Sequence, residues 1–412
     1  MQQTSDSVET PYGWTVATAS LLLMSIGFGA QYVAIVGLKP MAAEFNWPRS
    51  IPSLIPAMAQ LGAGVGGIFM GWWADRAGPR RPVMLGAVMM GLGALLASQA
   101  RGAFDLYLTY GLLIGALGNG TTFAPLMSNI TRWFDKNRGV ALSIVASGQS
   151  VAGGICPPLF RWGIDTYGWR ATLICYGIFS TTAMLPLAFL LRRPPPPAAR
   201  RLGAAGPAPR RELPLNPVLA QTLLSIAIVG CCVAMAMPIV HTVAFCSDLG
   251  YAPARGAEML SLLLAVAFIS RMFWGRLSDR IGGLKTIFIG SAAQAITLAC
   301  YMLVDGLVAL YVLSAAFGLA FGGIVPAYSL VVRDLFPARD AGWRIGIVYL
   351  SGTIGMALGG WIGGLVFDMF LRYQPAFGVG VFFNVVNLAA IGTLMVRLPR
   401  LPRSELATTQ PA

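Results

Sequence analysis

Charged residues are scarce in this chain. Asp, Glu, Lys and Arg make up 11% of its 412 residues, whereas 56% are hydrophobic, and the mean hydropathy is +0.69. A soluble domain carries about 25% charged residues, so this chain has too few of them to cover a water-exposed surface. The composition predicts a polytopic membrane protein.

Histidine and paired cysteine motifs are also scarce or missing. His241 is the single histidine, and the six cysteines include no C-x-x-C pair. A multi-histidine metal centre is therefore excluded, and neither a zinc site nor a disulfide framework is indicated. The sequence has no P-loop and no Ser-His-Asp set, so an enzyme or an ATP-driven pump is not indicated and we expect no cofactor. The first ten residues contain no Lys or Arg, so we expect no cleaved signal peptide.

Apolar runs long enough to cross a bilayer, about 20 residues each, recur along the whole chain. They predict an all-α membrane protein with twelve transmembrane helices in two six-helix bundles. Residues 192–217 are rich in Pro and Arg and predict a cytoplasmic linker between an N-terminal bundle (1–191) and a C-terminal bundle with a short tail (218–412). The expected spans are 14–38, 51–74, 82–100, 104–131, 139–160, 169–191, 218–245, 256–275, 284–304, 307–332, 344–367 and 375–396.

The basic residues orient these spans. Even-numbered connections and the C-terminal tail hold 21 of the 29 Lys and Arg residues, and odd-numbered connections hold 7. Because basic residues concentrate on the cytoplasmic side, we expect both termini inside the cell, in an inner membrane. Topology thus explains the net charge of +13 without nucleic-acid binding. The remaining basic residue, Arg271, lies within the eighth span, where a charge must face protein or a water-filled cavity.

The two halves of the chain repeat one loop sequence. GWWADRAGPRR (Gly71–Arg81) follows span two, and GRLSDRIGGLK (Gly275–Lys285) follows span eight, 204 residues later. Repeated halves are typical of alternating-access transporters whose site lies between them. We expect Gly71 and Gly275 to permit close helix crossing.

These loops resemble the signature of the major facilitator superfamily, at matching positions in both halves, and the resemblance covers essentially the whole chain. It implies the major facilitator fold with two pseudo-symmetric bundles. It also implies that the loops latch the cytoplasmic side when the transporter opens outward. The gate candidates are Asp75, Arg76, Arg80, Asp279 and Arg280.

Three further segments are similar to the monocarboxylate transporter family and its bacterial relatives, including the oxalate:formate antiporters. They are Tyr12–Trp14, Trp133–Leu142 and Arg271–Gly282. In those families an arginine at the Arg271 position binds the substrate carboxylate, so the resemblance implies the same role here.

Two departures limit that role. The aspartate of the animal transporters is Ala267 here, and the second substrate cation of the oxalate exchanger is Gly352. A guanidinium can bind a carboxylate through two parallel hydrogen bonds, and a single cation favours a monoanion over a dianion. The alternative is a structural Arg271 bound to helix-end carbonyls.

His241 is the candidate for proton coupling, because histidine titrates near neutrality. The alternative is a neutral histidine that donates a hydrogen bond to the substrate or to a neighbouring helix. Other polar and aromatic residues are candidates for substrate contact, several of them by their match to positions in the oxalate exchanger, with ordinary helix packing as the alternative for each. They are Gln31, Tyr32, Asn119, Phe123, Phe321 and Tyr349. We expect interhelical hydrogen bonds from Gln149, Asn384 and Asn387.

Together these features predict a monomeric secondary transporter of small organic monocarboxylate anions, with a proton as the coupled ion and the lipid bilayer as its surroundings. An organic-anion antiporter and a weak-acid efflux protein remain alternatives. A receptor or sensor built on a transporter fold is a third, although the short tails supply no obvious output element.

Overall fold

A computed structural model describes residues 9–134, 137–196, 215–336 and 338–397, and these residues form helices and short connections without a strand. The helices of the first half are α1 (Pro11–Val36), α2 (Leu38–Phe45), α3 (Ser50–Ala77), α4 (Arg80–Ser98), α5 (Ala103–Leu108), α6 (Ala124–Ile130), α7 (Arg138–Ala146) and α8 (Gly148–Phe189). Those of the second half are α10 (Pro217–Asp248), α11 (Pro253–Ile281), α12 (Gly283–Tyr301), α13 (Leu307–Phe321), α14 (Ile324–Leu335), α15 (Ala338–Phe370) and α16 (Gln374–Arg397).

The twelve predicted spans are confirmed, although two of them are hard to recognise. Ten helices in the described part are long and apolar enough to cross a membrane. One of these, Val140–Arg192, contains two spans, because Gly168 adopts a φ of 81° and breaks the helical path of α8. A further span consists of α5, a π-helical segment (Thr109–Gly118), a short 3₁₀ turn (Asn119–Thr121) and α6, each too short to cross alone.

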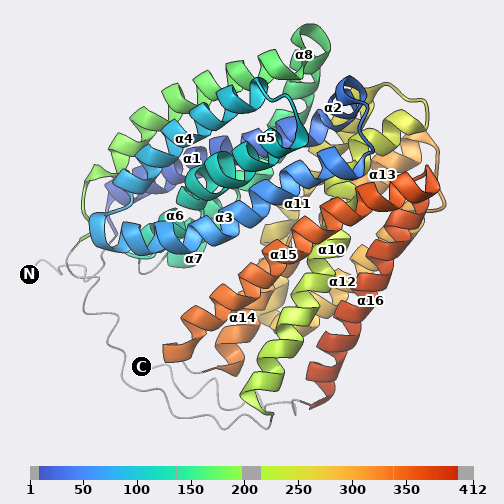
Figure 1. Ribbon diagram of the computed structural model, residues 1–412. Helices are drawn as coiled ribbons and strands as arrows, with labels where there is room; N and C mark the ends of the chain where they lie inside the picture. The colour runs from blue at the N-terminus through green and yellow to red at the C-terminus, as the bar shows by residue number, and fades with distance from the viewer. Residues whose placement is uncertain (1–8, 135–136, 197–214, 337, 398–412) are drawn as a thin grey trace, which may run out of the picture.

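The halves lie side by side in Figure 1, with the blue-to-green helices at the upper left and the yellow-to-red helices at the lower right. Two helix pairs carry most of the contact between them: α3 packs against α15, and α8 packs against α11. The division into two domains joined by residues 192–217 stays a prediction, since most of that segment lies outside the described residues.

Buried amides connect helices within the second half. Asn384 Nδ2 donates to the Ser291 carbonyl (3.1 Å), Asn387 Nδ2 donates to Ser291 Oγ (2.7 Å), and the Tyr328 hydroxyl donates to Asn387 Oδ1 (2.9 Å). The interhelical hydrogen bonds expected of the two asparagines are thus confirmed. The same expectation is wrong for Gln149, whose side chain bonds no residue in the described ranges.

Glycines permit close helix contact, but not at the repeated loops. A Cβ on Gly66 would overlap the Ala116 carbonyl, and one on Gly318 would overlap the backbone of α11. A Cβ on Gly275 would meet nothing within 4 Å, and one on Gly71 would lie at ordinary van der Waals distance, 3.8 Å from its neighbour. The expected close crossing at these two glycines is therefore wrong for this conformation, because the tight crossings lie elsewhere along the helices.

Candidate functional site

Two spans are interrupted at corresponding positions. The π-helical segment of span four ends at Gly118, and span ten breaks at Gly322 between α13 and α14. These glycines are 204 residues apart, the same offset as the repeated loops. Helix ends inside a membrane leave backbone groups free to bind ligands or side chains, and paired Gly-interrupted spans indicate a transport site.

Arg271 binds at the second interruption. Its Nε donates to the Gly322 carbonyl (3.2 Å) and its Nη1 donates to the Ala146 carbonyl (2.9 Å). Ala146 is the last residue of α7, and Gly322 follows α13, so the guanidinium lies between two helix C-termini with partial negative charge. Because Ala146 belongs to the first half, Arg271 bridges the halves. These contacts match the structural alternative, and its role in anion binding stays a prediction.

Two of the aromatic candidates interact with this arginine. Tyr32 and Tyr349 are within electrostatic reach of the guanidinium. The Tyr349 hydroxyl is 2.9 Å from Ser329 Oγ, and its ring lies 6.4 Å from that of Phe123. Phe321 is buried directly before Gly322 in the chain. The structure therefore gathers side chains from both halves around Arg271.

Gln31 and Tyr32 line a cavity between the halves. Its walls come from α1, α3, α8, α10 and α15, and its volume of about 10 Å³ suits roughly one water molecule. Two lining residues fix its depth: Gln60 lies ten residues from the start of α3, and Gly360 lies ten residues from the end of α15. At 1.5 Å per residue both residues lie about 15 Å from the end of the bundle where α3 begins and α15 ends. This depth is half of a hydrocarbon core of about 30 Å. The cavity lies near the midplane.

Asn119 is buried at the first interruption. Its Oδ1 has no hydrogen-bond partner among the described residues, and it lies against Gly27, where an added Cβ would come within 3.0 Å of it. Gly27 is one helical turn from Gln31 on α1, so Asn119 adds an unsatisfied acceptor close to the cavity.

His241 lies away from Arg271. It is fully buried, and its Nε2 is 2.9 Å from the Gly360 carbonyl. A carbonyl only accepts hydrogen bonds, so Nε2 carries the hydrogen, while Nδ1 has no partner in the described part of the chain. His241 is about two turns from the end of α10, whereas Arg271 is about five turns from the start of α11 at the same end of the bundle. The structure does not bring these two candidates together.

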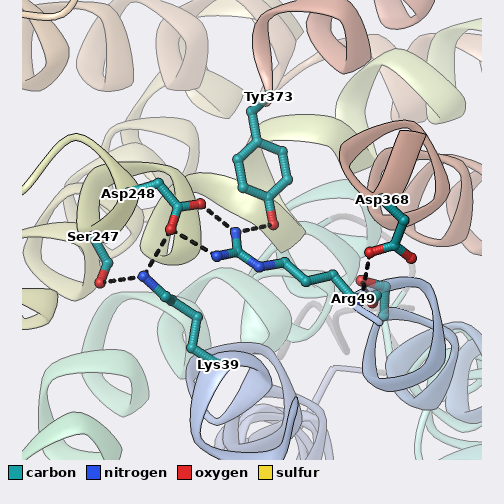
Figure 2. Close-up of polar contacts among 7 residues, drawn as sticks. Lys39, Arg49, Ser247, Asp248, Asp368 and Tyr373 are labelled. Atoms are coloured by element: carbon teal, nitrogen blue, oxygen red, sulfur yellow. Dashed lines mark hydrogen bonds and ion pairs between the residues drawn. The ribbon is translucent and has the colours of Figure 1, made fainter. Parts of the chain in front are cut away.

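A polar cluster joins the two halves at the end of the bundle where α10 ends and α11 begins (Figure 2). Arg49 pairs with both carboxylate oxygens of Asp248, at 2.7 Å from Nη2 to Oδ1, and donates to the Tyr373 hydroxyl at 3.1 Å. Lys39 Nζ lies 2.8 Å from Asp248 Oδ1 and 2.9 Å from Ser247 Oγ. We call this cluster, together with Asp368, the Asp248 latch.

Asp368 completes the latch by capping a helix of the other half. Its carboxylate accepts hydrogen bonds from the backbone N–H groups of Arg49 (2.6 Å) and Ser50 (2.8 Å), where α3 begins. A carboxylate at a helix N-terminus is favourable for both hydrogen bonding and the helix dipole. Burial alone would lower the pKa of Arg49, but the hydrogen bond to Asp248 raises it, so the guanidinium stays charged.

The latch does not stand out in the sequence, because Lys39 and Arg49 count there only as basic residues of the loops. A signal was present, since Asp248 and Asp368 end spans seven and eleven on the same side of the membrane. Acidic residues at these boundaries, opposite the few basic residues of that side, could have indicated pairing across the halves.

The gate candidates lie at the opposite end of the bundle. Asp75 accepts a hydrogen bond from Ser128 Oγ (3.2 Å) and pairs with Arg132 within the first half. The Arg76 guanidinium lies 4.0 Å from the centre of the Trp72 ring, and that of Arg80 lies 4.4 Å from the Phe189 ring. The Asp279 side chain lies outside the described part, and the gate role of these residues and of Arg280 stays a prediction.

Two helical halves, paired interruptions and a charged side chain between the halves define a membrane transporter. The family model of the Major Facilitator Superfamily matches residues 18–307 and 222–411, and the chain belongs to this superfamily. It is therefore a secondary transporter and not an enzyme.

The names of individual relatives point to different functions. The chain is 27% identical to monocarboxylate transporter 13 of Bos taurus over 390 residues, covering 93% of this chain and 89% of that protein. It is 24% identical to the agnestins efflux protein AgnL12 of Paecilomyces divaricatus, covering 80% and 73%.

A solved structure supports the fold. A bacterial homolog of the human lysosomal transporter Spinster, in an inward-facing and occupied conformation, matches with a TM-score of 0.68 and 17% identity over 94% of this chain and 96% of that one. At this identity the match shows that the two proteins share a fold.

Proposed function

We propose that this chain transports small organic monocarboxylate anions by proton-coupled symport. The observation that carries the proposal is the position of Arg271, a cation between the two halves whose described hydrogen-bond acceptors are two neutral carbonyls. A carboxylate can supply two charge-assisted hydrogen bonds in place of these and would also neutralise the buried charge.

The same contacts suggest how binding is coupled to movement. The bond from Arg271 to Ala146 joins the second half to the first. A carboxylate that takes over this nitrogen removes a contact that holds the halves together, so substrate binding and rocking of the halves share one group. This is a differential interaction of the kind that a ligand needs in order to shift a conformational equilibrium.

The substrate class follows from charge. One cation compensates one carboxylate and leaves a dianion with an uncompensated charge at the membrane centre, which is costly. The position that holds the second substrate cation in the oxalate exchanger is Gly352 in this chain. The likeness to a protein named as a monocarboxylate transporter supports the same class.

The distribution of basic residues supports an orientation. By the positive-inside rule we propose that the end with Asp75 and both termini lie in the cytoplasm and the Asp248 latch lies outside, and we propose the inner membrane as the location. In this orientation the latch closes the outer side of the transporter.

His241 is our candidate for the proton carrier. Its Nδ1 has no described partner and is the nitrogen that would take up a proton. Because His241 binds Gly360, which lines the midplane cavity, protonation of His241 would change the contact between α10 and α15.

Uptake into proteoliposomes tests the function. Empty vesicles with an inward proton gradient should accumulate radiolabelled monocarboxylates, from a panel of lactate, pyruvate, formate and aromatic acids, in preference to oxalate. His241→Gln should abolish the accumulation of substrate that the proton gradient drives. It should preserve the exchange of substrate across the membrane when the pH is the same on both sides. Preference for oxalate over every monocarboxylate would contradict the charge argument.

Organic-anion exchange is the second candidate, including efflux of weak acids. It is favoured by Ala267, where a proton-carrying aspartate is missing, and by the likeness to a protein named for efflux. Uptake that occurs only into vesicles preloaded with an acid would support exchange over symport.

A further inference from the structure

Three glutamines converge on the midplane cavity. Gln31 lies on α1, Gln60 on α3 and Gln149 on α8, so all three come from the first half. Their side-chain amides form no hydrogen bond with any residue in the described ranges.

Two buried glutamines elsewhere have backbone partners. Gln221 Nε2 donates to the Arg344 carbonyl (3.3 Å), and Gln294 Nε2 donates to the Cys231 carbonyl (3.4 Å). Gln31 is 9% exposed, and Gln60 and Gln149 are half-buried, so their amides keep access to the cavity instead of being sealed in the protein interior. A water molecule or a ligand in the cavity can supply the hydrogen-bond partners that the described residues do not.

The cavity also limits what can bind. Its volume of about 10 Å³ admits a single group the size of a water molecule. No charged side chain lines it, and the second half contributes the apolar side chains of Ile239, Val240 and Met356. The group that fits is small and uncharged. It is either a hydroxyl, which donates and accepts hydrogen bonds, or a carbonyl, which accepts them from the amide N–H groups.

One of the three glutamines lies close along the chain to the carbonyl that Arg271 binds. Arg271 binds the carbonyl of Ala146, and Gln149 lies three residues further along the chain, about one helical turn or 5 Å away. Tyr32 connects the two places, because its hydroxyl donates to the Gln149 carbonyl (3.3 Å) and lies within electrostatic reach of Arg271.

We propose that Gln31, Gln60 and Gln149 form an amide subsite for an uncharged hydroxyl or carbonyl group of the substrate, located about one helical turn from its carboxylate. The inference rests on the proposed function, because it places the carboxylate at Arg271. It narrows the substrate to acids whose second polar group lies beyond the 2-position, such as 3-hydroxybutanoate or 4-hydroxybenzoate.

Matched pairs of acids test the subsite. Dissociation constants are measured by ligand-induced thermal stabilisation of the purified full chain, for 3-hydroxybutanoate against butanoate and for 4-hydroxybenzoate against benzoate. The hydroxy acid of at least one pair should bind about tenfold tighter, the factor expected from one or two neutral hydrogen bonds.

Volume-matched variants then locate the effect. Gln60→Met and Gln149→Met should bring the ratio of the two dissociation constants close to one, whereas Gln99→Met, an exposed position at the end of α4, should leave it unchanged. Arg271→Gln should weaken both members of a pair by the same factor and preserve the ratio.

The outcomes separate the two claims. Equal affinities in the unmodified protein, an unchanged ratio in both cavity variants, or no stabilisation by any acid would overturn the amide subsite. Unchanged affinities in Arg271→Gln would instead contradict the proposed function, while the ratio would still decide the subsite.

Discussion

Asp248→Asn should loosen one end of the transporter, because Asp248 is the acceptor shared by both basic residues of the latch. The substitution preserves the shape of the side chain but removes its charge. Arg49 and Lys39 then keep only a neutral oxygen in place of a carboxylate that accepts at 2.7 Å and 2.8 Å.

The magnitude follows from the burial of the three side chains. A hydrogen bond to a charged group contributes about 1.5–3 kcal/mol, and solvent screening lowers this for exposed pairs. Arg49, Asp248 and Lys39 are 15%, 24% and 34% exposed, so the lower part of the range applies. A loss of about 1.5–2 kcal/mol shifts the equilibrium away from the latched conformation by about 10- to 30-fold.

Distance measurements between spin labels provide the assay. Labels on Ala43 in α2 and Ala254 in α11 are exposed at the latch end and lie on different halves. With the native cysteines replaced, double electron–electron resonance in nanodiscs should show a larger population at long distance in Asp248→Asn. Asp305→Asn, an exposed acidic position at the same end but outside the latch, is the matched control.

Two results would refute this reasoning. The first is a distance distribution in Asp248→Asn that matches those of the unmodified protein and of the control. The second is an additive effect of two substitutions. Since Arg49 and Asp248 act as one pair, we expect the double variant Arg49→Gln with Asp248→Asn to shift the distance distribution little more than Asp248→Asn alone.

Two further predictions concern stability. Burial alone would raise the pKa of Glu44, but the hydrogen bonds from Arg170 and from the indole of Trp169 lower it. The ionised Glu44 side chain therefore contributes to thermal stability above the usual carboxylate pKa of about 4.3, and this contribution is lost as the pH falls through its lowered pKa in the folded protein. The difference in melting temperature between the unmodified protein and Glu44→Gln should shrink below about pH 4. Gly363→Ala should lower the melting temperature by several degrees, because the added methyl group would overlap the imidazole of His241, which packs against it. Gly275→Ala, with nothing within 4 Å, should leave the melting temperature unchanged; equal effects of the two substitutions would contradict the packing.

The span pattern could be predicted because it depends on local composition. Runs of apolar residues set the positions of α1, α3 and α10 to within a few residues. The break at Gly168 was correctly expected as a connection, whereas the short helix α2 was not expected because eight residues carry too little periodicity to stand out.

The depth of Arg271 was likewise readable from the sequence, but its partners were not. Ala146 and Gly322 are 125 and 51 residues away along the chain, and backbone carbonyls have no residue signature. Tertiary packing alone places these helix ends beside the guanidinium. The same reason explains why the convergence of Gln60 with Gln149 could not be foreseen.

Arg271→Gln tests the central claim most directly. Its matched control is Arg255→Gln, the same substitution at an exposed arginine on the same helix, paired with Glu258. Proton-driven uptake of a transported monocarboxylate into proteoliposomes should fall by about a hundredfold in Arg271→Gln, as expected when one partner of a buried charge pair is removed, and stay near normal in Arg255→Gln. Saturable uptake in Arg271→Gln within about twofold of the control would contradict the account, because the anion would then bind without this arginine.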